Sequence, residues 1–293
     1  MCMIERVHRP DFLIIGAQKC GTTWLWEIIK QHPGTDLGKE KEIQFFSATN
    51  NYRRGREWYY AHFKKLDAKK MIGEASTDYL YDRILIDNIT SDTLLPCIPE
   101  LVKNELPDVK ILYILRDPVR RAISAYRHHL QYRRFSPKTG LVEAAKKHPR
   151  LRIIERGYYA HYLELWQKHF HPNQMHSLVF EEDVVRHPEK SIQDVYTFLG
   201  LDREFAPKDI QKKQNKSWGW THITLNYYLG PWYGVLYRVT RKTSMFPAIE
   251  KINFIKQPNI DQSDIAYLRS LYLPEKEKVE ALLGRKLQYW DYS

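Results

Sequence analysis

Cysteine is scarce in this sequence. Cys2, Cys20 and Cys97 are the only three among 293 residues. They are too few and too scattered for a disulfide framework or a zinc site, so we expect a reducing compartment. The sequence has no run of apolar residues long enough to span a bilayer, and no apolar signal core follows the N-terminal methionine. These absences predict no transmembrane segment and a cytoplasmic location.

Glycine is also sparse, at 13 residues, while proline is ordinary at 15, and no internal repeat or flexible linker divides the chain. This composition excludes collagen-like and low-complexity proteins, and 43% apolar residues exclude intrinsic disorder. We expect residues 1–293 to form one domain. Acidic residues number 35 against 46 Lys and Arg, which gives a net charge of +11. That charge predicts an anionic partner: nucleic acid, a membrane surface, a phosphorylated cofactor or an acidic substrate.

Short apolar runs alternate with segments of helical spacing along the chain. Strands are expected at Phe12–Ile15, Lys70–Gly73, Val109–Leu115 and Gln174–Phe180. Helices are expected at Thr22–Gln31, Asp117–Tyr132, Leu151–His169 and Pro188–Leu199, with a closing helix between Tyr272 and Trp290. This alternation is typical of an α/β fold with a central parallel sheet flanked by helices.

The first expected strand is followed by a loop suited to binding phosphate. Gly16 and Gly21 bound this loop, Lys19 lies inside it, and Thr22 and Thr23 open the next helix. Backbone N–H groups and the helix dipole attract an anion at such a junction. A plain glycine-rich turn would explain the glycines, but it would not explain the lysine and the threonine pair. We therefore favour an anion site.

The same spacing matches the loop of nucleotide triphosphatases, which makes a P-loop kinase or NTPase an alternative. That motif requires a lysine directly after the second glycine, followed by Ser or Thr. Thr22 stands at the lysine position here. The substitution argues against triphosphate hydrolysis.

A second phosphate site is expected at Arg116, which directly follows the expected strand ending at Leu115. Ligands bind at this edge of parallel sheets. Arg116 and Ser124 could grip one phosphate, the guanidinium through a bidentate fork and the hydroxyl through a hydrogen bond. Alternatively, Arg116 pairs locally with Asp117 and Ser124 faces solvent. Two phosphate-binding sites at the ends of neighbouring strands suggest a nucleotide that is phosphorylated at two positions.

Together the two segments resemble the sulfotransferases that use 3′-phosphoadenylyl sulfate (PAPS), most closely the heparan sulfate N-sulfotransferases and 3-O-sulfotransferases. The likeness runs in order through most of residues 10–220. Four further stretches carry it: Glu42–Phe46, Gly73–Ser76 with Tyr79, Gly157–Tyr162 with Trp166, and Lys213–Trp220. The resemblance implies a single P-loop-like α/β domain that transfers a sulfuryl group.

The resemblance also implies roles for individual residues, with PAPS as donor and no metal. Lys19 would contact the bridging and leaving oxygens of the phosphosulfate, Glu42 would be the base, and His128 would support it near the acceptor. A loop around Lys216 and Gly219 would close over the nucleotide. The implied nucleotide contacts are Gln18, Lys19, Cys20, Gly21, Thr22, Thr23, Trp24, Arg116, Ser124, Lys216, Trp218, Gly219 and Trp220.

In-line sulfuryl transfer requires a base to take the acceptor proton, and two glutamates compete for that role. Glu42 lies in a charge run and could instead be a surface carboxylate paired with Lys39 or Lys41. Glu74 ends the second expected strand and could instead accept hydrogen bonds from Lys19 or a backbone N–H. The resemblance favours Glu42.

The sequence departs from the heparan sulfate enzymes at two positions where they carry a lysine, here Ala75 and Trp218. A long anionic glycan therefore does not follow as acceptor. A carbohydrate or glycolipid is the first expectation and a small metabolite the second.

The irregular segment 201–260 is rich in aromatic and basic residues, especially between Trp218 and Phe246. Such a mixture suits sugar stacking, an adenine clamp or peripheral membrane contact. The alternative to a binding role is that these aromatic side chains are simply buried against the core, and we favour this alternative slightly. A nucleic-acid-binding module is a further alternative for the whole chain. However, Lys and Arg are concentrated at 53–70, 116–134 and 146–156 rather than in one stripe.

Overall fold

Five parallel strands form one sheet in the order β2-β3-β1-β4-β5 in a computed structural model that describes residues 8–38, 40–81, 96–211, 219–233, 235 and 260–292. The strands are β1 (Phe12–Gly16), β2 (Thr35–Asp36), β3 (Met71–Ala75), β4 (Lys110–Leu115) and β5 (Met175–Val179). All residues of β1, and all but the first of β4, are buried. Strands covered on both faces need continuous apolar runs, which is why these two were readable from the sequence.

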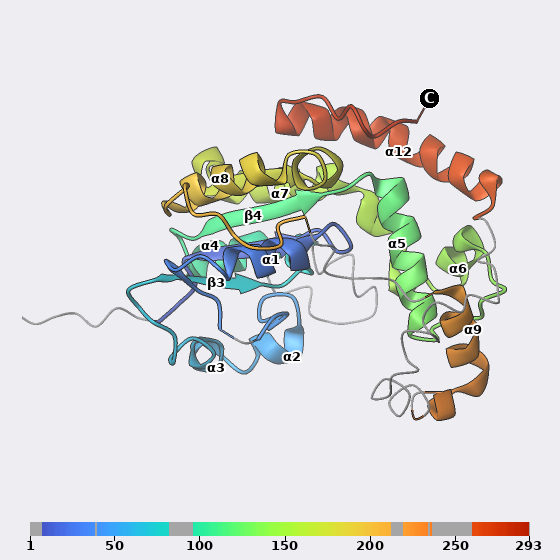
Figure 1. Ribbon diagram of the computed structural model, residues 1–293, viewed down its shortest axis with the longest axis horizontal. Helices are drawn as coiled ribbons and strands as arrows, with labels where there is room; N and C mark the ends of the chain where they lie inside the picture. The colour runs from blue at the N-terminus through green and yellow to red at the C-terminus, as the bar shows by residue number, and fades with distance from the viewer. Residues whose placement is uncertain are drawn as a thin grey trace, which may run out of the picture.

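Helices cover both faces of the sheet (Figure 1). They are α1 (Thr22–Ile29), α2 (Thr49–Tyr52), α3 (Arg56–Ala61), α4 (Ile98–Glu105), α5 (Pro118–Gln131), α6 (Leu141–Lys147), α7 (Tyr159–His169), α8 (Pro188–Leu199), α9 (Trp220–Leu229) and α12 (Gln262–Leu283). Helix α1 meets α8 through a hydrogen bond from the Tyr196 hydroxyl to the Ile28 carbonyl, and α4 packs against α7. Helix α12 packs on α7. The predicted α/β fold with a central parallel sheet is confirmed.

The ends of two helices follow from their capping residues. Asp117 accepts a hydrogen bond from the backbone N–H of Val119 at 2.9 Å, and Pro118 occupies the first position of α5. Helix α8 ends at Gly200, whose φ of 80° is left-handed. Both helix boundaries were expected from the sequence.

The predicted helix from Leu151 to His169 is wrong in its first half. Residues 149–151 and 155–157 form separate 3₁₀ turns, and α7 begins only at Tyr159. Arg152 between the two turns has a φ of 50°, which interrupts a right-handed helix. The Ile154 carbonyl accepts from the Gly157 N–H of the second 3₁₀ turn at 2.9 Å and also from the Tyr272 hydroxyl at 2.6 Å.

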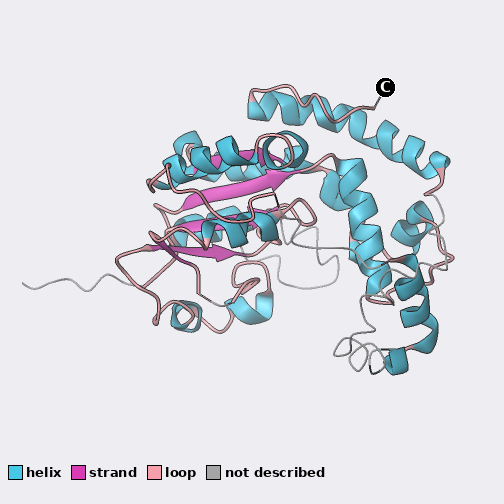
Figure 2. Cartoon of the chain, in the orientation of Figure 1, coloured by secondary structure: helices cyan, strands magenta, loops and turns pink. Residues whose placement is uncertain are grey.

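Helix α5 extends beyond the sheet and joins it to a second hydrophobic core. Helices α5, α6, α9 and α12 surround that core at one end of the molecule (Figure 2). Val119, Leu130, Leu141, Trp220 and Tyr272 are among its buried members. No helix in the described ranges is both long and apolar enough to cross a bilayer.

Gly73 in β3 leaves no room for a side chain, because a Cβ there would lie 2.2 Å from Cζ of Phe12 on the neighbouring strand. We expect Gly73→Ala to lower the free energy of unfolding by about 1–3 kcal/mol through overpacking. Gly140→Ala is the matched control, since its Cβ would meet only Asp264 Oδ2 at 3.6 Å. Urea unfolding followed by circular dichroism measures both changes, and equal losses would contradict the packing argument.

Candidate active site at the carboxyl edge of the sheet

The carboxyl ends of β1, β3 and β4 are joined by backbone hydrogen bonds just beyond the strands. The N–H of Ala17 donates to the Ile114 carbonyl at 2.8 Å, and the N–H of Leu80 donates to the Ile15 carbonyl at 2.8 Å. The N–H of Gln18 donates to the Tyr81 hydroxyl at 3.2 Å. The loop after β1, the turn after β3 and Arg116 after β4 therefore lie at one edge of the sheet.

The loop after β1 presents unpaired backbone donors at the start of α1. Gly21 takes a left-handed φ of 101°, and a Cβ there would lie 2.8 Å from the Phe180 ring, so a side chain is excluded. No side chain caps α1. Among the described residues, no acceptor meets the backbone N–H groups of Lys19, Gly21, Thr22, Thr23 and Trp24. Converging free N–H groups at a helix N-terminus bind anions.

Lys19 adds a positive charge to this loop and lies against His128 of α5. Its Nζ is 3.4 Å from His128 Nδ1. Burial lowers the pKa of Lys19, and the nearby Arg116 lowers it further. Burial, followed by the charge of Lys19, lowers the pKa of His128 to about 4. His128 is therefore neutral at pH 7, and because an ammonium group can only donate, Nδ1 is the acceptor.

Arg116 is held over the loop by three contacts. Its Nη1 donates to the Lys19 carbonyl at 3.3 Å, its Nε lies 3.6 Å from a Glu181 carboxylate oxygen, and its guanidinium covers the Phe180 ring at 4.8 Å. The Asp117 N–H donates to the same carboxylate at 3.2 Å. Asp117 itself pairs with Arg120 rather than Arg116. Ser124, two turns into α5, is partly exposed.

Arg121 is a buried charge that sequence reasoning missed. Its side chain is 0% exposed and donates to the Ile153 carbonyl, and no described carboxylate pairs with it. Cys20 and Tyr159 lie in its electrostatic neighbourhood, with Cys20 Sγ 3.6 Å from the Tyr159 hydroxyl. Burial raises the pKa of the Cys20 thiol to about 11, so this thiol stays neutral. A guanidinium without a described carboxylate partner therefore interacts electrostatically with the loop after β1.

Glu42 lies beside the turn after β3. One carboxylate oxygen accepts from the Thr77 N–H at 3.0 Å, and the other lies 3.9 Å from Lys41 Nζ. Burial raises the pKa of Glu42 above its usual range, and the Thr77 hydrogen bond opposes this shift. Lys41 Nζ also donates to Thr23 Oγ1 at 3.1 Å, which ties the segment to the phosphate loop.

Glu74 has a more enclosed position. It is 1% exposed and accepts hydrogen bonds from the hydroxyls of Tyr59 at 2.5 Å, Ser76 at 2.7 Å and Tyr79 at 2.8 Å. Burial raises its pKa, and these hydroxyls oppose the shift. The carboxylate of Glu74, the alternative base expected from the sequence, is therefore already hydrogen-bonded to three hydroxyl groups.

The other residues expected to contact the nucleotide are Trp24 and residues of the segment from Lys216 to Trp220. Lys216 and Trp218 lie outside the described residues. Trp24 is buried and its Nε1 donates to the Ile210 carbonyl at 2.7 Å. Gly219 precedes α9, and Trp220 is buried in the second core. Tyr228 and Trp232 are exposed, so the simple burial expected for the aromatics of this segment is only partly correct.

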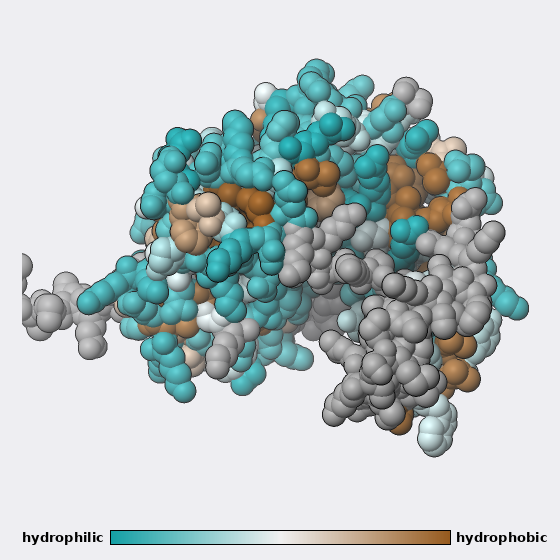
Figure 3. Space-filling model, viewed as in Figure 1, coloured by the Kyte–Doolittle hydropathy of each residue, from teal (hydrophilic) through white to brown (hydrophobic). Residues whose placement is uncertain are grey.

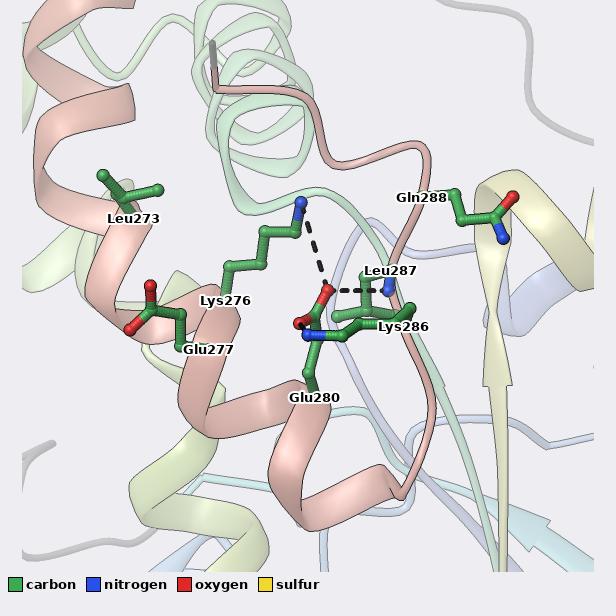
Figure 4. A pocket seen from close by; sticks show the side chains of 7 residues that line it. All are labelled: Leu273, Lys276, Glu277, Glu280, Lys286, Leu287 and Gln288. Atoms are coloured by element: carbon green, nitrogen blue, oxygen red, sulfur yellow. Dashed lines mark hydrogen bonds and ion pairs between the residues drawn. The ribbon is translucent and has the colours of Figure 1, made fainter.

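A separate pocket lies on α12 and the residues after it (Figure 4). Its central side chain, Glu280, accepts hydrogen bonds from Lys286 and from the Leu287 N–H, both at 2.9 Å. None of the expected site residues lines this pocket. Within the described ranges, no three His, Cys, Asp or Glu side chains gather in a way that could hold a metal ion.

A parallel α/β sheet whose first strand continues through a loop bounded by glycines into a helix defines a P-loop-like fold. The family model described as a sulfotransferase domain matches residues 9–218, more than half of the chain, so this chain belongs to the sulfotransferase family. The resemblance seen in the sequence is confirmed.

Relatives and a solved structure agree with this assignment. The bifunctional heparan sulfate N-deacetylase/N-sulfotransferase 3 of Mus musculus is 27% identical over 96% of the chain, which spans only 31% of that relative. The heparan sulfate glucosamine 3-O-sulfotransferase 5 of Mus musculus is 24% identical over 97% of the chain and 77% of its own length. A sulfotransferase from Alicyclobacillus acidocaldarius superposes with a TM-score of 0.68 at 25% identity, covering 96% of this chain and 98% of that one.

His128 and its neighbour His129 make stability depend on pH. The pKa of each is lowered to about 4, mainly by burial. The unfolded chain takes up these protons near pH 6.5, so the free energy of unfolding should rise between about pH 4 and 6.5. We expect His128→Gln and His129→Gln each to flatten this rise in urea unfolding. Exposed His161→Gln serves as control and should leave it unchanged. His176, whose pKa is also lowered by burial, leaves part of the rise in the double variant, so a rise as steep as that of the unmodified chain would contradict the assignment.

Proposed function

We propose that this sulfotransferase uses PAPS as donor and transfers its sulfuryl group to a hydroxyl or amine of a carbohydrate or glycolipid acceptor. The run of free N–H groups at the start of α1, joined by Lys19, is the observation that carries the proposal. Sulfuryl transfer itself follows from the family. The identities of the donor, the catalytic base and the acceptor are the parts that we propose here.

The donor assignment rests on two cationic sites at neighbouring strand ends. The free N–H groups after β1 fit a 5′-phosphosulfate, and Arg116 after β4, with Ser124 on α5, fits a 3′-phosphate. When bound, PAPS supplies the sulfuryl group and a phosphate leaving group. Lys19 offsets the negative charge that develops on that leaving group, since a preorganised cation in a desolvated site stabilises it strongly. Neutral His128 accepts from Lys19 and so orients its ammonium group.

The base in this proposal is Glu42. Burial raises its pKa, which makes its carboxylate a better proton acceptor, while Thr77 holds the carboxylate in one orientation. Glu42 takes the proton of the attacking hydroxyl or amine. Glu74 is less suited, because an acceptor could reach its carboxylate only by displacing the hydroxyls of Tyr59, Ser76 and Tyr79.

The acceptor class is argued from the relatives and from charge. The curated relatives named above act on heparan sulfate according to their names. In this chain Ala75 and Trp218 replace lysines that the heparan sulfate enzymes carry. We therefore propose a less anionic carbohydrate or glycolipid, with a small metabolite as the second candidate.

Donor binding is tested with the product nucleotide, adenosine 3′,5′-bisphosphate. We expect it to raise Tm in a thermal-shift assay, with ATP giving little effect. Lys19→Ala should weaken bisphosphate binding at least tenfold because the loop loses its cation. Exposed Lys64→Ala is the control. Preference for magnesium-ATP would instead support an NTPase, and oligonucleotide binding that the bisphosphate cannot displace would support a nucleic-acid-binding protein.

The base is tested by an isosteric substitution. Glu42→Gln should lower the transfer rate by about 10²–10⁴-fold while leaving bisphosphate binding intact. In the unmodified chain the rate should rise with pH through a pKa above the usual glutamate value, since only the carboxylate accepts a proton. The readout is the mass gain of one sulfuryl group on a panel of acceptors. If Glu42→Gln retained turnover and Glu74→Gln lost it, Glu74 would be the base.

A further inference from the structure

Helix α9 exposes large apolar side chains on one face. Leu225, Tyr228 and Leu229 are 38%, 59% and 45% exposed, and Trp232 in the following turn is 79% exposed. The first three are spaced by three and four residues, so they share a helix face. Figure 3 shows brown side chains at this end of the molecule. The buried side of the helix is also apolar, with Trp220 and Ile223 in the second core.

The carboxyl end of α5 lies beside this face and is strongly basic. Asn226 Nδ2 donates to the Gln131 carbonyl at 2.8 Å, and a Cβ on Gly230 would lie 3.2 Å from an Arg133 guanidinium nitrogen. Tyr132, Arg133 and Arg134 are all exposed. The sequence has no Asp or Glu in residues 118–142 or 219–249. The combined surface therefore carries aromatic rings and arginines without a carboxylate from either stretch.

Isolated exposed apolar residues are ordinary, but a contiguous group marks an interaction surface. Tyr and Trp rings favour the headgroup level of a bilayer, and arginines next to them attract anionic lipids. A helix whose exposed face is apolar and whose neighbour is basic lies in the plane of such an interface. We propose that α9 and the end of α5, through Leu225, Tyr228, Leu229, Trp232, Tyr132, Arg133 and Arg134, dock on the surface of an anionic lipid bilayer.

This surface is continuous with the candidate active site along α5. The rings of Tyr132 and His128 lie 4.8 Å apart, and His128 contacts Lys19 at 3.4 Å. Docking brings the transfer site to the headgroup level. An acceptor anchored in the bilayer by a lipid tail can then present its hydroxyl there, a consequence that rests on the proposed function.

Vesicle flotation with the full chain tests the docking. One set of vesicles is phosphatidylcholine alone, and the other contains about one third phosphatidylserine. We expect the protein to float with the anionic vesicles and not with the neutral ones, and high salt to release it, because screening weakens the attraction. Failure to float with anionic vesicles would overturn the proposal.

Matched variants separate the apolar and charged contributions. Leu229→Ser should lower the fraction bound severalfold, whereas Leu273→Ser on α12, at a similar exposure of 49%, should not. Arg133→Glu combined with Arg134→Glu should lower binding about tenfold or more, with exposed Arg203→Glu as control. Circular dichroism checks that each variant is folded, and Trp232→Ser provides a second apolar variant. Binding that none of the site variants weakens would also overturn the proposal.

Two further measurements distinguish other outcomes. A dimer in sedimentation that Leu229→Ser converts to monomer, without vesicle binding, would show that the face is covered by a second copy instead. Lys19→Ala should retain vesicle binding while losing bisphosphate binding. A failure of the proposed donor therefore leaves the docking result interpretable.

Discussion

All five strands run in the same direction, and this constraint places every candidate catalytic group at one edge of the sheet. Loops that are far apart in the sequence, after residues 16, 75, 115 and 179, meet there because parallel strands end on the same side. The backbone bonds from Ala17 to Ile114 and from Leu80 to Ile15 hold these loops in register. The positions of Lys19 and Arg116 are consequences of that register.

The second organising feature is an excess of buried positive charge at this edge. Lys19, Arg116 and Arg121 lie close together, and Glu181 is the described carboxylate that pairs with one of them. Buried cations without a carboxylate partner cost free energy, and the fold tolerates them because the two large cores supply compensating apolar burial. A dianionic ligand would relieve that cost, so binding and stability are coupled at the site.

Much of the fold could be predicted from the sequence, because a sheet buried on both faces leaves continuous apolar runs such as Ile111–Leu115. The junction between β1 and α1 was predicted from Gly16, Gly21 and the helical spacing that follows, whereas phosphate binding there remains a proposal. Burial of Arg121 was not, since a charged residue in the first turns of a helix is normally solvated. Helix α9 was missed for a related reason. It is apolar on both sides, so its sequence lacks the alternation with polar residues that marks a surface helix.

The close contact between Gly73 and the Phe12 ring predicts which residues should vary together in related sequences. The two positions lie on neighbouring strands and share one volume with the Leu37 side chain, so a methyl group at 73 would fit only if the ring at 12 became smaller and Leu37 shifted. Related sequences should therefore exchange these two residues together: a larger residue at 73 should accompany an aliphatic one at 12. The pair would then serve as a marker of register between β1 and β3 in relatives whose overall identity is too low to align that part of the sheet.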